Sequence, residues 1–131
     1  MSPPAQFRLA VERRDLAAAG ELFAEDIVFH SPVTFHPFIG RETVTRLLGE
    51  VVQVFEDFCF TDELDTGGAH ALIFRASVAG KEIEGIDLLR FGADELIADF
   101  TVMLRPLSAL VPFAQAMGER AQAAGLERTR A

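Results

Sequence analysis

The sequence predicts an α+β domain in which a curved antiparallel sheet packs on N-terminal helices. Helical spacing dominates the first half of the chain, and strand-like alternation follows from Phe58 to Pro106. Half of the 131 residues are hydrophobic, which is enough for a buried core. No repeat, low-complexity tract or linker interrupts the pattern. We therefore expect a single domain over residues 1–131.

The first half is expected to contain helices and one short strand. Pro3 and Pro4 suit the first turn of a helix that continues to about Arg14. Asp15 fits the N-cap of a second helix, which Ala24-Glu25-Asp26 would end. The elements expected next are a strand, a loop and a longer helix, at 27–31, 33–39 and 41–55.

The second half is typical of antiparallel strands joined by tight turns. The turns are expected at 67–68, 79–82 and 92–95, and the last strand ends at Pro106. A C-terminal helical segment follows, which Pro112 is expected to kink or split. From about Arg120 onward the chain is polar and is expected to fray.

Composition and charge exclude several classes of partner. The net charge of −8 argues against a nucleic acid and against an anionic membrane surface. No apolar run reaches the roughly 18 residues of a spanning helix, and the N-terminus has no signal-peptide pattern. Cys59 is the only cysteine, so no disulfide can form within the chain, which fits a cytoplasmic location. No metal-ligand spacing and no nucleotide-binding loop occurs, so neither a metal nor a cofactor is expected.

One carboxylate interrupts an otherwise apolar strand face. If Val78 lies opposite Ile83, alternation puts Asp87 on the same face as Phe74. A carboxyl on that face loses water, which favours its neutral form. Asp87 could then donate a hydrogen bond to a ligand oxygen, or it could bond a backbone amide or an arginine as a structural partner.

The opposite face of these strands is expected to form the outer surface. If Phe91 lies opposite Leu96, Phe100 joins the Asp87 face and Asp99 points outward. The outer-face residues proposed for an interface between two copies are Ile73, Ile86, Leu88, Thr101 and Met103.

Four segments together resemble the nuclear transport factor 2-like superfamily, which includes ketosteroid isomerases and SnoaL-type polyketide cyclases. The segments are 14–33, 38–44, 84–91 and 97–107. The resemblance covers nearly the whole chain. It implies a cone-shaped, cystatin-like fold with an apolar pocket, and a homodimer formed through the outer sheet face.

The resemblance also relates known site positions to residues of this chain. Asp87, within GIDLLRF, matches the oxyanion-donor Asp of the isomerases. Ser31 stands where they have the catalytic Asp, and Phe7 stands where they have a Tyr. The His and Asp of the SnoaL-type cyclases match Phe100 and Val102. The usual base and phenol are therefore missing, and the resemblance leaves open whether the chain is an enzyme.

We therefore expect a small-molecule pocket for an apolar ligand with one oxygen, which Asp87 would bond. The expected lining is Phe7, Val11, Ser31, Phe74, Phe100, Val102 and Leu104. If the protein is an enzyme, the resemblance implies isomerase-, cyclase- or dehydratase-like chemistry on a carbonyl compound, with Asp87 as acid or oxyanion donor. His36, in the loop near the pocket mouth, is the candidate base. The alternative is a non-enzymatic, homodimeric ligand-binding or adaptor protein with a degenerate active site. His30 would face outward if Ser31 faces the pocket.

Overall fold

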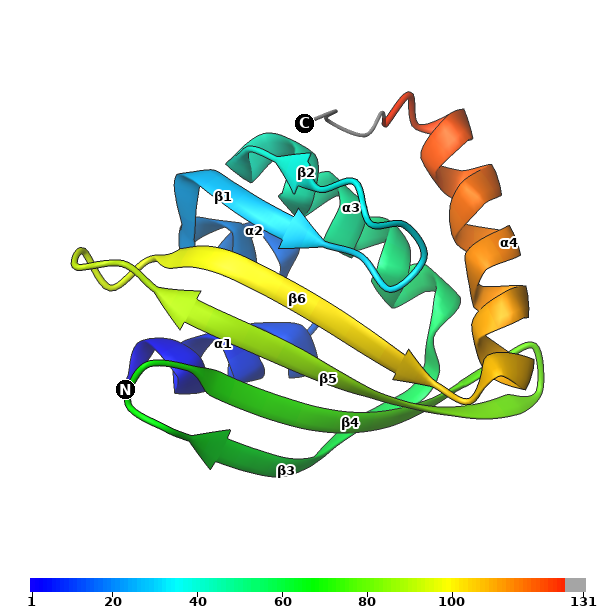
Figure 1. Cartoon of the computed structure of the whole chain (residues 1–131), viewed down its shortest axis with the longest axis horizontal. Helices are drawn as coiled ribbons and strands as arrows, with labels where there is room; N and C mark the ends of the chain where they lie inside the picture. The colour runs from blue at the N-terminus through cyan, green and yellow to red at the C-terminus, as the bar shows by residue number, and fades with distance from the viewer. Residues whose placement is uncertain (127–131) are drawn as a thin grey trace.

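The structure of the chain is a computed structural model, and it describes residues 1–126. The helices are α1 (Pro3–Glu12), α2 (Leu16–Glu21), α3 (Arg41–Val54) and α4 (Leu107–Ala123). The strands are β1 (Phe23–His30), β2 (Phe38–Ile39), β3 (Glu56–Asp65), β4 (His70–Val78), β5 (Lys81–Phe91) and β6 (Ile97–Arg105). Figure 1 shows a twisted sheet with α1, α2 and α3 behind it and α4 along one end. The α+β class predicted from the sequence is confirmed.

The sheet is mostly antiparallel, as predicted, but it contains one parallel pair that the prediction did not include. Its strand order is β2-β1-β6-β5-β4-β3. Strands β3 to β6 form an antiparallel meander, but β1 lies parallel to β6. Parallel neighbours need a long connection, and the segment from β2 to β5 supplies it.

Strand β1 begins earlier than the sequence indicates. The prediction ended a helix at Ala24-Glu25-Asp26, whereas α2 ends at Glu21 and β1 already starts at Phe23. The register between β1 and β6 shifts between Phe23 and Val28, so an irregularity interrupts the strand. Alternation is lost at that point, which is why the sequence pattern did not reveal the strand. The predicted loop 33–39 likewise contains the short strand β2.

The predicted strand registers are wrong by two residues, while the predicted faces are correct. Val78 pairs with Lys81, because Ala79 and Gly80 both have positive φ and form a two-residue turn. Asp87 consequently lies opposite Leu72 on one side and Val102 on the other. A shift of two residues keeps every side chain on its original face.

The inner face of the meander is closely packed around a glycine in β5. A Cβ added at Gly85 would lie 2.3 Å from Cζ of Phe74 and 2.6 Å from Cδ2 of Leu104. The absence of a side chain therefore lets these two neighbours meet over the strand. The aromatic ring of Phe74 is held in this way beside Asp87, two residues further along β5.

The helices cover the inner face and one end of the sheet. Ser2 and Asp15 cap α1 and α2 by accepting hydrogen bonds from backbone N–H groups. Pro112 is predicted to kink or split the C-terminal helix; the split does not occur, since α4 continues through Pro112 to Ala123. Phe113 and Met117 are buried just after the proline, so packing holds this part of the helix in place. The predicted frayed end is helical up to Ala123, and its last residues, 127–131, lie outside the described residues.

Candidate functional site

A cavity of about 640 Å³ lies between the inner face of the sheet and the helices. This volume falls within the range of about 300–1,000 Å³ that is typical of small-molecule sites. Every strand of the sheet contributes at least one lining residue. The rest come mainly from α1 and the turn after it, the loop after β1, α3 and α4. The helical apolar lining from α3 and α4 comprises Val44, Leu47, Leu48, Val51, Val52, Phe113, Ala114, Met117 and Ala121.

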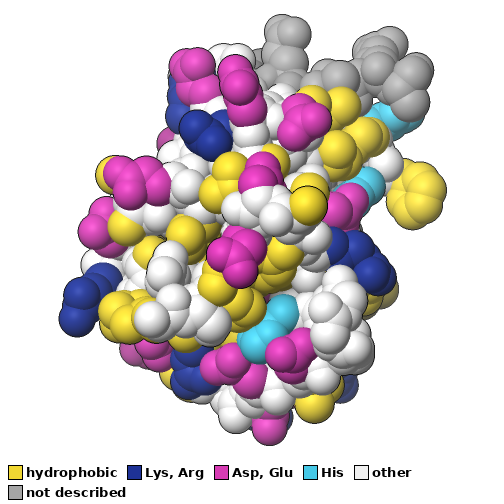
Figure 2. Space-filling view, turned by 90° about the vertical axis from the view of Figure 1, so that its left-hand side faces the viewer, with side chains coloured by type: hydrophobic (Ala, Val, Ile, Leu, Met, Phe, Trp, Pro, Cys, Tyr) yellow, Lys and Arg dark blue, Asp and Glu magenta, His cyan; other side chains and the backbone are white. Residues whose placement is uncertain are grey.

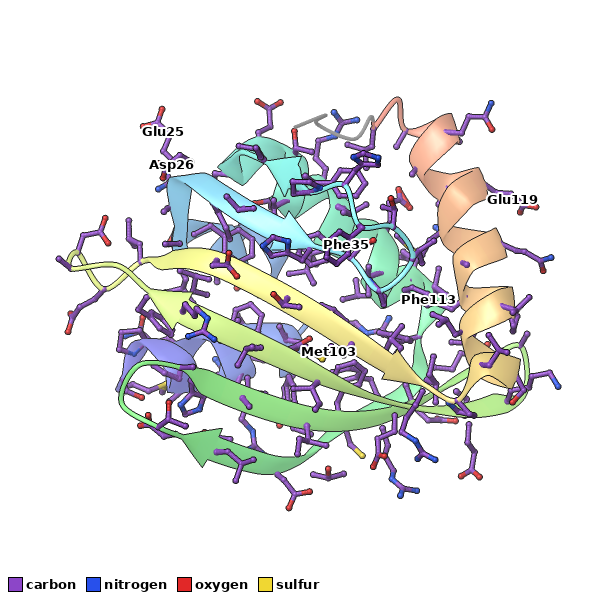
Figure 3. The ribbon with its side chains drawn as sticks, in the orientation of Figure 1. Glu25, Asp26, Phe35, Met103, Phe113 and Glu119 are labelled. Atoms are coloured by element: carbon purple, nitrogen blue, oxygen red, sulfur yellow. The ribbon has the colours of Figure 1, made fainter. Side chains whose placement is uncertain are left out.

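Aromatic rings form much of the wall. The Phe55 ring stacks on Phe113 with 5.2 Å between ring centroids, and Phe58 lies 4.9 Å from Phe74. Figure 3 shows Phe113 where α4 approaches the end of α3. On the other side, Phe100 meets Phe29 edge to face at 5.1 Å. The rings surround the space without filling it, so the cavity offers an apolar chamber.

The carboxyl of Asp87 enters this chamber from the middle of β5. Asp87 is only 7% exposed, and it is the one buried charged or polar residue within residues 1–126. Within that range, its carboxyl has no hydrogen bond and no ion pair. Burial raises the pKa of Asp87 to about 8. The carboxyl is therefore largely neutral at pH 7, with an O–H that can be donated to a ligand in the cavity.

The other polar lining residues are Arg14, Ser31, Thr34 and Gln122. The Ser31 hydroxyl accepts hydrogen bonds from the backbone N–H groups of Val33 and Thr34, both at 3.2 Å. Ser31 thus shapes the loop at the edge of the cavity. Arg14 lies at the turn from α1 to α2 and is exposed. It lines the cavity from this turn, whereas Asp87 lines it from the sheet.

The structure brings most of the predicted site residues together. Besides Asp87, the predicted residues that line the cavity are Val11, Ser31, Phe74, Phe100 and Val102. Phe7 is not among the lining residues, because its ring is wholly buried against Phe23 and Phe100. Leu104 lies beyond Gly85 and lines a shallow groove outside the cavity instead.

The two loop-proximal histidines lie outside the cavity. His36 is exposed and is not a lining residue, so the structure does not place its ring beside Asp87. His30 faces outward as predicted, where Nε2 shares a hydrogen bond of 3.0 Å with Oδ2 of Asp99. Among the described residues that line the cavity, therefore, Asp87 is the only one whose side chain titrates between pH 4 and 9.

Sequence reasoning missed Arg14 as a lining residue and a charged cluster at the edge of the sheet. In this cluster, Glu63 accepts a hydrogen bond from Arg8 and pairs with Nε2 of His70 at 2.9 Å. The guanidinium of Arg8 and the His70 ring together lower the pKa of Glu63. No local motif marks either feature, because both depend on how α1 lies on the strands.

Two further observations concern other classes of site. No three His, Cys, Asp or Glu side chains in the part of the chain that the structure describes are placed to hold a metal ion. None of the described helices is both long enough and apolar enough to cross a membrane.

Comparison with known proteins places the chain in a structural context. The sequence profile of the SnoaL-like domain matches residues 5–100. An uncharacterised protein with a cystatin-like fold from Silicibacter pomeroyi is 30% identical with a TM-score of 0.90, covering 94% of this chain and 87% of that one. A steroid delta-isomerase from Pseudomonas aeruginosa is 36% identical with a TM-score of 0.89, covering 95% of this chain and 93% of that one.

A more distant structure agrees in fold alone. An NTF2-like protein of unknown function from Cytophaga hutchinsonii is 18% identical with a TM-score of 0.65, covering 82% of this chain and 91% of that one. A search among curated proteins gave no match.

Proposed function

This chain belongs to the SnoaL-like domain family, and on that premise we propose that it binds a small apolar carbonyl compound, with Asp87 donating a hydrogen bond to the carbonyl oxygen. The observation that carries the proposal is a carboxyl without a partner in residues 1–126, directed into an apolar cavity. Because an unpaired buried polar group is unfavourable, a ligand oxygen is the natural partner for it.

The same contact would favour chemistry at the carbon next to the carbonyl. A donor at the carbonyl oxygen stabilises the negative charge that develops there during enolisation. Isomerisation, cyclisation and dehydration of carbonyl compounds can all begin with such a step. The 36% identical steroid delta-isomerase supports a carbonyl substrate of this kind.

This chemistry also needs a proton acceptor near the carbon next to the carbonyl. Ser31 replaces the expected Asp, and its hydroxyl is engaged by backbone N–H groups. His36 remains the predicted base and would have to move its side chain toward the cavity. Binding and polarisation of the carbonyl are therefore proposed as the core function, and turnover is tested separately.

The binding test uses prodan, a fluorescent naphthyl ketone. The chain has no Trp and no Tyr, so emission from the bound ketone is free of protein fluorescence. Asp87→Leu should weaken prodan binding about 3- to 10-fold, the effect of one hydrogen bond of about 1 kcal/mol. Asp87→Asn keeps a donor and should bind prodan more nearly like the wild type.

A matched ligand without a carbonyl group provides the control. Phenylnaphthylamine should bind the wild type and Asp87→Leu almost equally, since it has no oxygen for Asp87 to bond. Equal loss of both ligands in Asp87→Leu would count against the hydrogen bond and indicate a general change in the cavity. Turnover of a steroid ketone with an isolated double bond, compared between wild type and His36→Gln, would test the proposed base.

A second candidate function is a homodimeric binding or adaptor protein. Ile73, Ile86 and Met103 form one apolar row across three neighbouring strands on the outer face. Met103 is 53% exposed and points toward the viewer in Figure 3. Light scattering should report a dimer at micromolar concentration and a monomer for Met103→Lys. A monomeric wild type would remove this candidate.

A further inference from the structure

Arg14 is the only basic side chain among the described residues that line the cavity. Within residues 1–126 its guanidinium has neither a hydrogen bond nor an ion pair. Among the described residues, six of the other eight arginines bond a carboxylate or a carbonyl oxygen, whereas Arg13 and Arg90 do not; the six are Arg8, Arg41, Arg46, Arg75, Arg105 and Arg120. Of the three described arginines without such a bond, Arg14 is the one that lines the cavity.

The backbone fixes the origin of this side chain at the rim of the cavity. Arg14 has a φ of 55°, a left-handed conformation that is uncommon for residues other than glycine. Hydrogen bonds hold the turn: the Arg14 N–H donates to Val11 and the Asp15 N–H donates to Ala10, at 3.0 and 2.9 Å. Val11, three residues earlier, also lines the cavity. The turn that carries Arg14 is thus part of the wall.

We propose that the ligand carries an anionic group, most simply a carboxylate, which Arg14 binds at the rim while the apolar body and a carbonyl oxygen lie deeper, near Asp87. This inference rests on the function proposed above and defines its substrate class as an apolar oxo acid. A guanidinium presents several N–H donors in one plane, which matches the two oxygens of a carboxylate.

The rest of the molecule makes such a local contact necessary for an anionic ligand. The net charge is −8, and Figure 2 shows Asp and Glu side chains spread over the face seen there. This overall charge repels anions. Arg14 supplies a positive charge at the rim of the chamber. Inside, a largely neutral Asp87 adds little repulsion.

The test compares two fluorescent probes that differ by one anionic group. Anilinonaphthalene sulfonate is an anion, and phenylnaphthylamine is its neutral counterpart. Arg14→Gln should weaken binding of the sulfonate about fivefold, the upper end of the effect of an exposed ion pair. The same substitution should leave phenylnaphthylamine binding unchanged, because that probe has no charge for Arg14 to bind.

Arg13→Gln is the matched control. Arg13 is the exposed neighbour, does not line the cavity, and loses the same charge on substitution. Any effect of net charge alone would appear equally in both variants. Arg14→Lys keeps the charge and should retain part of the sulfonate affinity. Unchanged melting temperatures would show that the variants are folded.

The possible failures are distinguishable. If phenylnaphthylamine binds the wild type but Arg14→Gln and Arg13→Gln weaken the sulfonate equally, the role of Arg14 is overturned and the proposed function stands. If neither probe binds the wild type, the ligand-binding function fails, and the inference about Arg14 fails with it. If Arg14→Gln weakens both probes equally, the residue acts on cavity shape and the anion contact is wrong.

Discussion

Glu63 and Asp87 are two carboxyl groups in one row of the sheet, and their surroundings shift their acidity in opposite directions. Glu63 pairs with Leu72, and Leu72 pairs with Asp87. Directly paired residues of antiparallel strands lie on the same face, and two strand spacings separate the outer members by about 10 Å. The pKa of Glu63 is lowered, whereas that of Asp87 is raised to about 8.

The difference arises from what covers each position. Glu63 is on the edge strand β3, where Arg8 of α1 and His70 of β4 reach its oxygens. Asp87 is on an inner strand, and above it lies the cavity instead of a cation. The comparison shows how the neighbours of a carboxyl in this sheet decide its role. Where a helix brings a cation to it, the carboxyl forms a stabilising ion pair. Where it faces the cavity instead, it keeps its proton and can donate it in a hydrogen bond.

The largest expected effect concerns Asp87 and the pH dependence of stability. The folded state keeps the proton of Asp87 up to about pH 8, whereas the unfolded chain loses it near the ordinary value of 3.8. The free energy of unfolding should therefore fall as the pH rises between these values, by about 2 kcal/mol from pH 6 to pH 8. Asp87→Asn should remove this contribution, as measured by urea unfolding at several pH values.

An exposed carboxylate on β3 provides the control for this measurement. Asp62→Asn should leave the slope between pH 6 and pH 8 as it is in the wild type, because Asp62 is exposed. A slope that is the same in Asp87→Asn and the wild type would mean that Asp87 is ionised in the folded protein, and the contrast with Glu63 would disappear.

A smaller effect is expected at Glu63, in the opposite direction of pH. Because its pKa is lowered on folding, its stabilising contribution is complete above the ordinary value of 4.5 and is lost as the pH falls below it. Its side chain is 35% exposed, so water screens the contacts. Glu63→Gln should lower the free energy of unfolding at pH 7 by about 0.5–1 kcal/mol, with no further loss in acid. If the stability of Glu63→Gln fell in acid as much as that of the wild type, the interaction of Glu63 with Arg8 and His70 would be contradicted.

The smallest effect is expected at Glu12, a residue of α1 that also pairs with Arg8. Substituting it tests whether any carboxylate near Arg8 stabilises the fold or only the one on the edge strand. Glu12 pairs with Arg8 one turn along α1, at 3.6 Å, and its side chain is 44% exposed. Glu12→Gln should change the free energy of unfolding by about 0.3 kcal/mol. If Glu12→Gln lowered the free energy of unfolding as much as Glu63→Gln does, any carboxylate near Arg8 would stabilise the fold equally. The position of Glu63 on the edge strand would then not matter.

The face of Asp87 could be predicted from sequence although its pairing could not. Alternation along a strand has a period of two, so an error of two residues at the Ala79-Gly80 turn left every face unchanged. The turn itself was misjudged because Ala79 adopts a left-handed conformation that sequence patterns assign to glycine.

Other parts of the site depend on contacts between distant segments. Arg14 lines the cavity together with residues of α3 and the sheet that are distant in sequence, and no local pattern indicates this. Likewise, the tie between Arg8 and Glu63 joins residues that are far apart in sequence. The resemblance to a family supplied the fold and the position of Asp87. It could not supply the lining contributed by α3 and α4, which follows from three-dimensional packing.

The parallel pairing of β1 with β6 has a consequence for the order in which the protein folds. Strands β3 to β6 are joined by short turns, so their pairing closes small loops. By contrast, Phe29 of β1 pairs with Phe100 of β6 across about 70 residues of chain. Contacts of such long range form slowly. We therefore expect the meander to assemble before β1 docks, so that the chamber acquires its Phe29 wall late, and a ligand would speed refolding little while slowing unfolding.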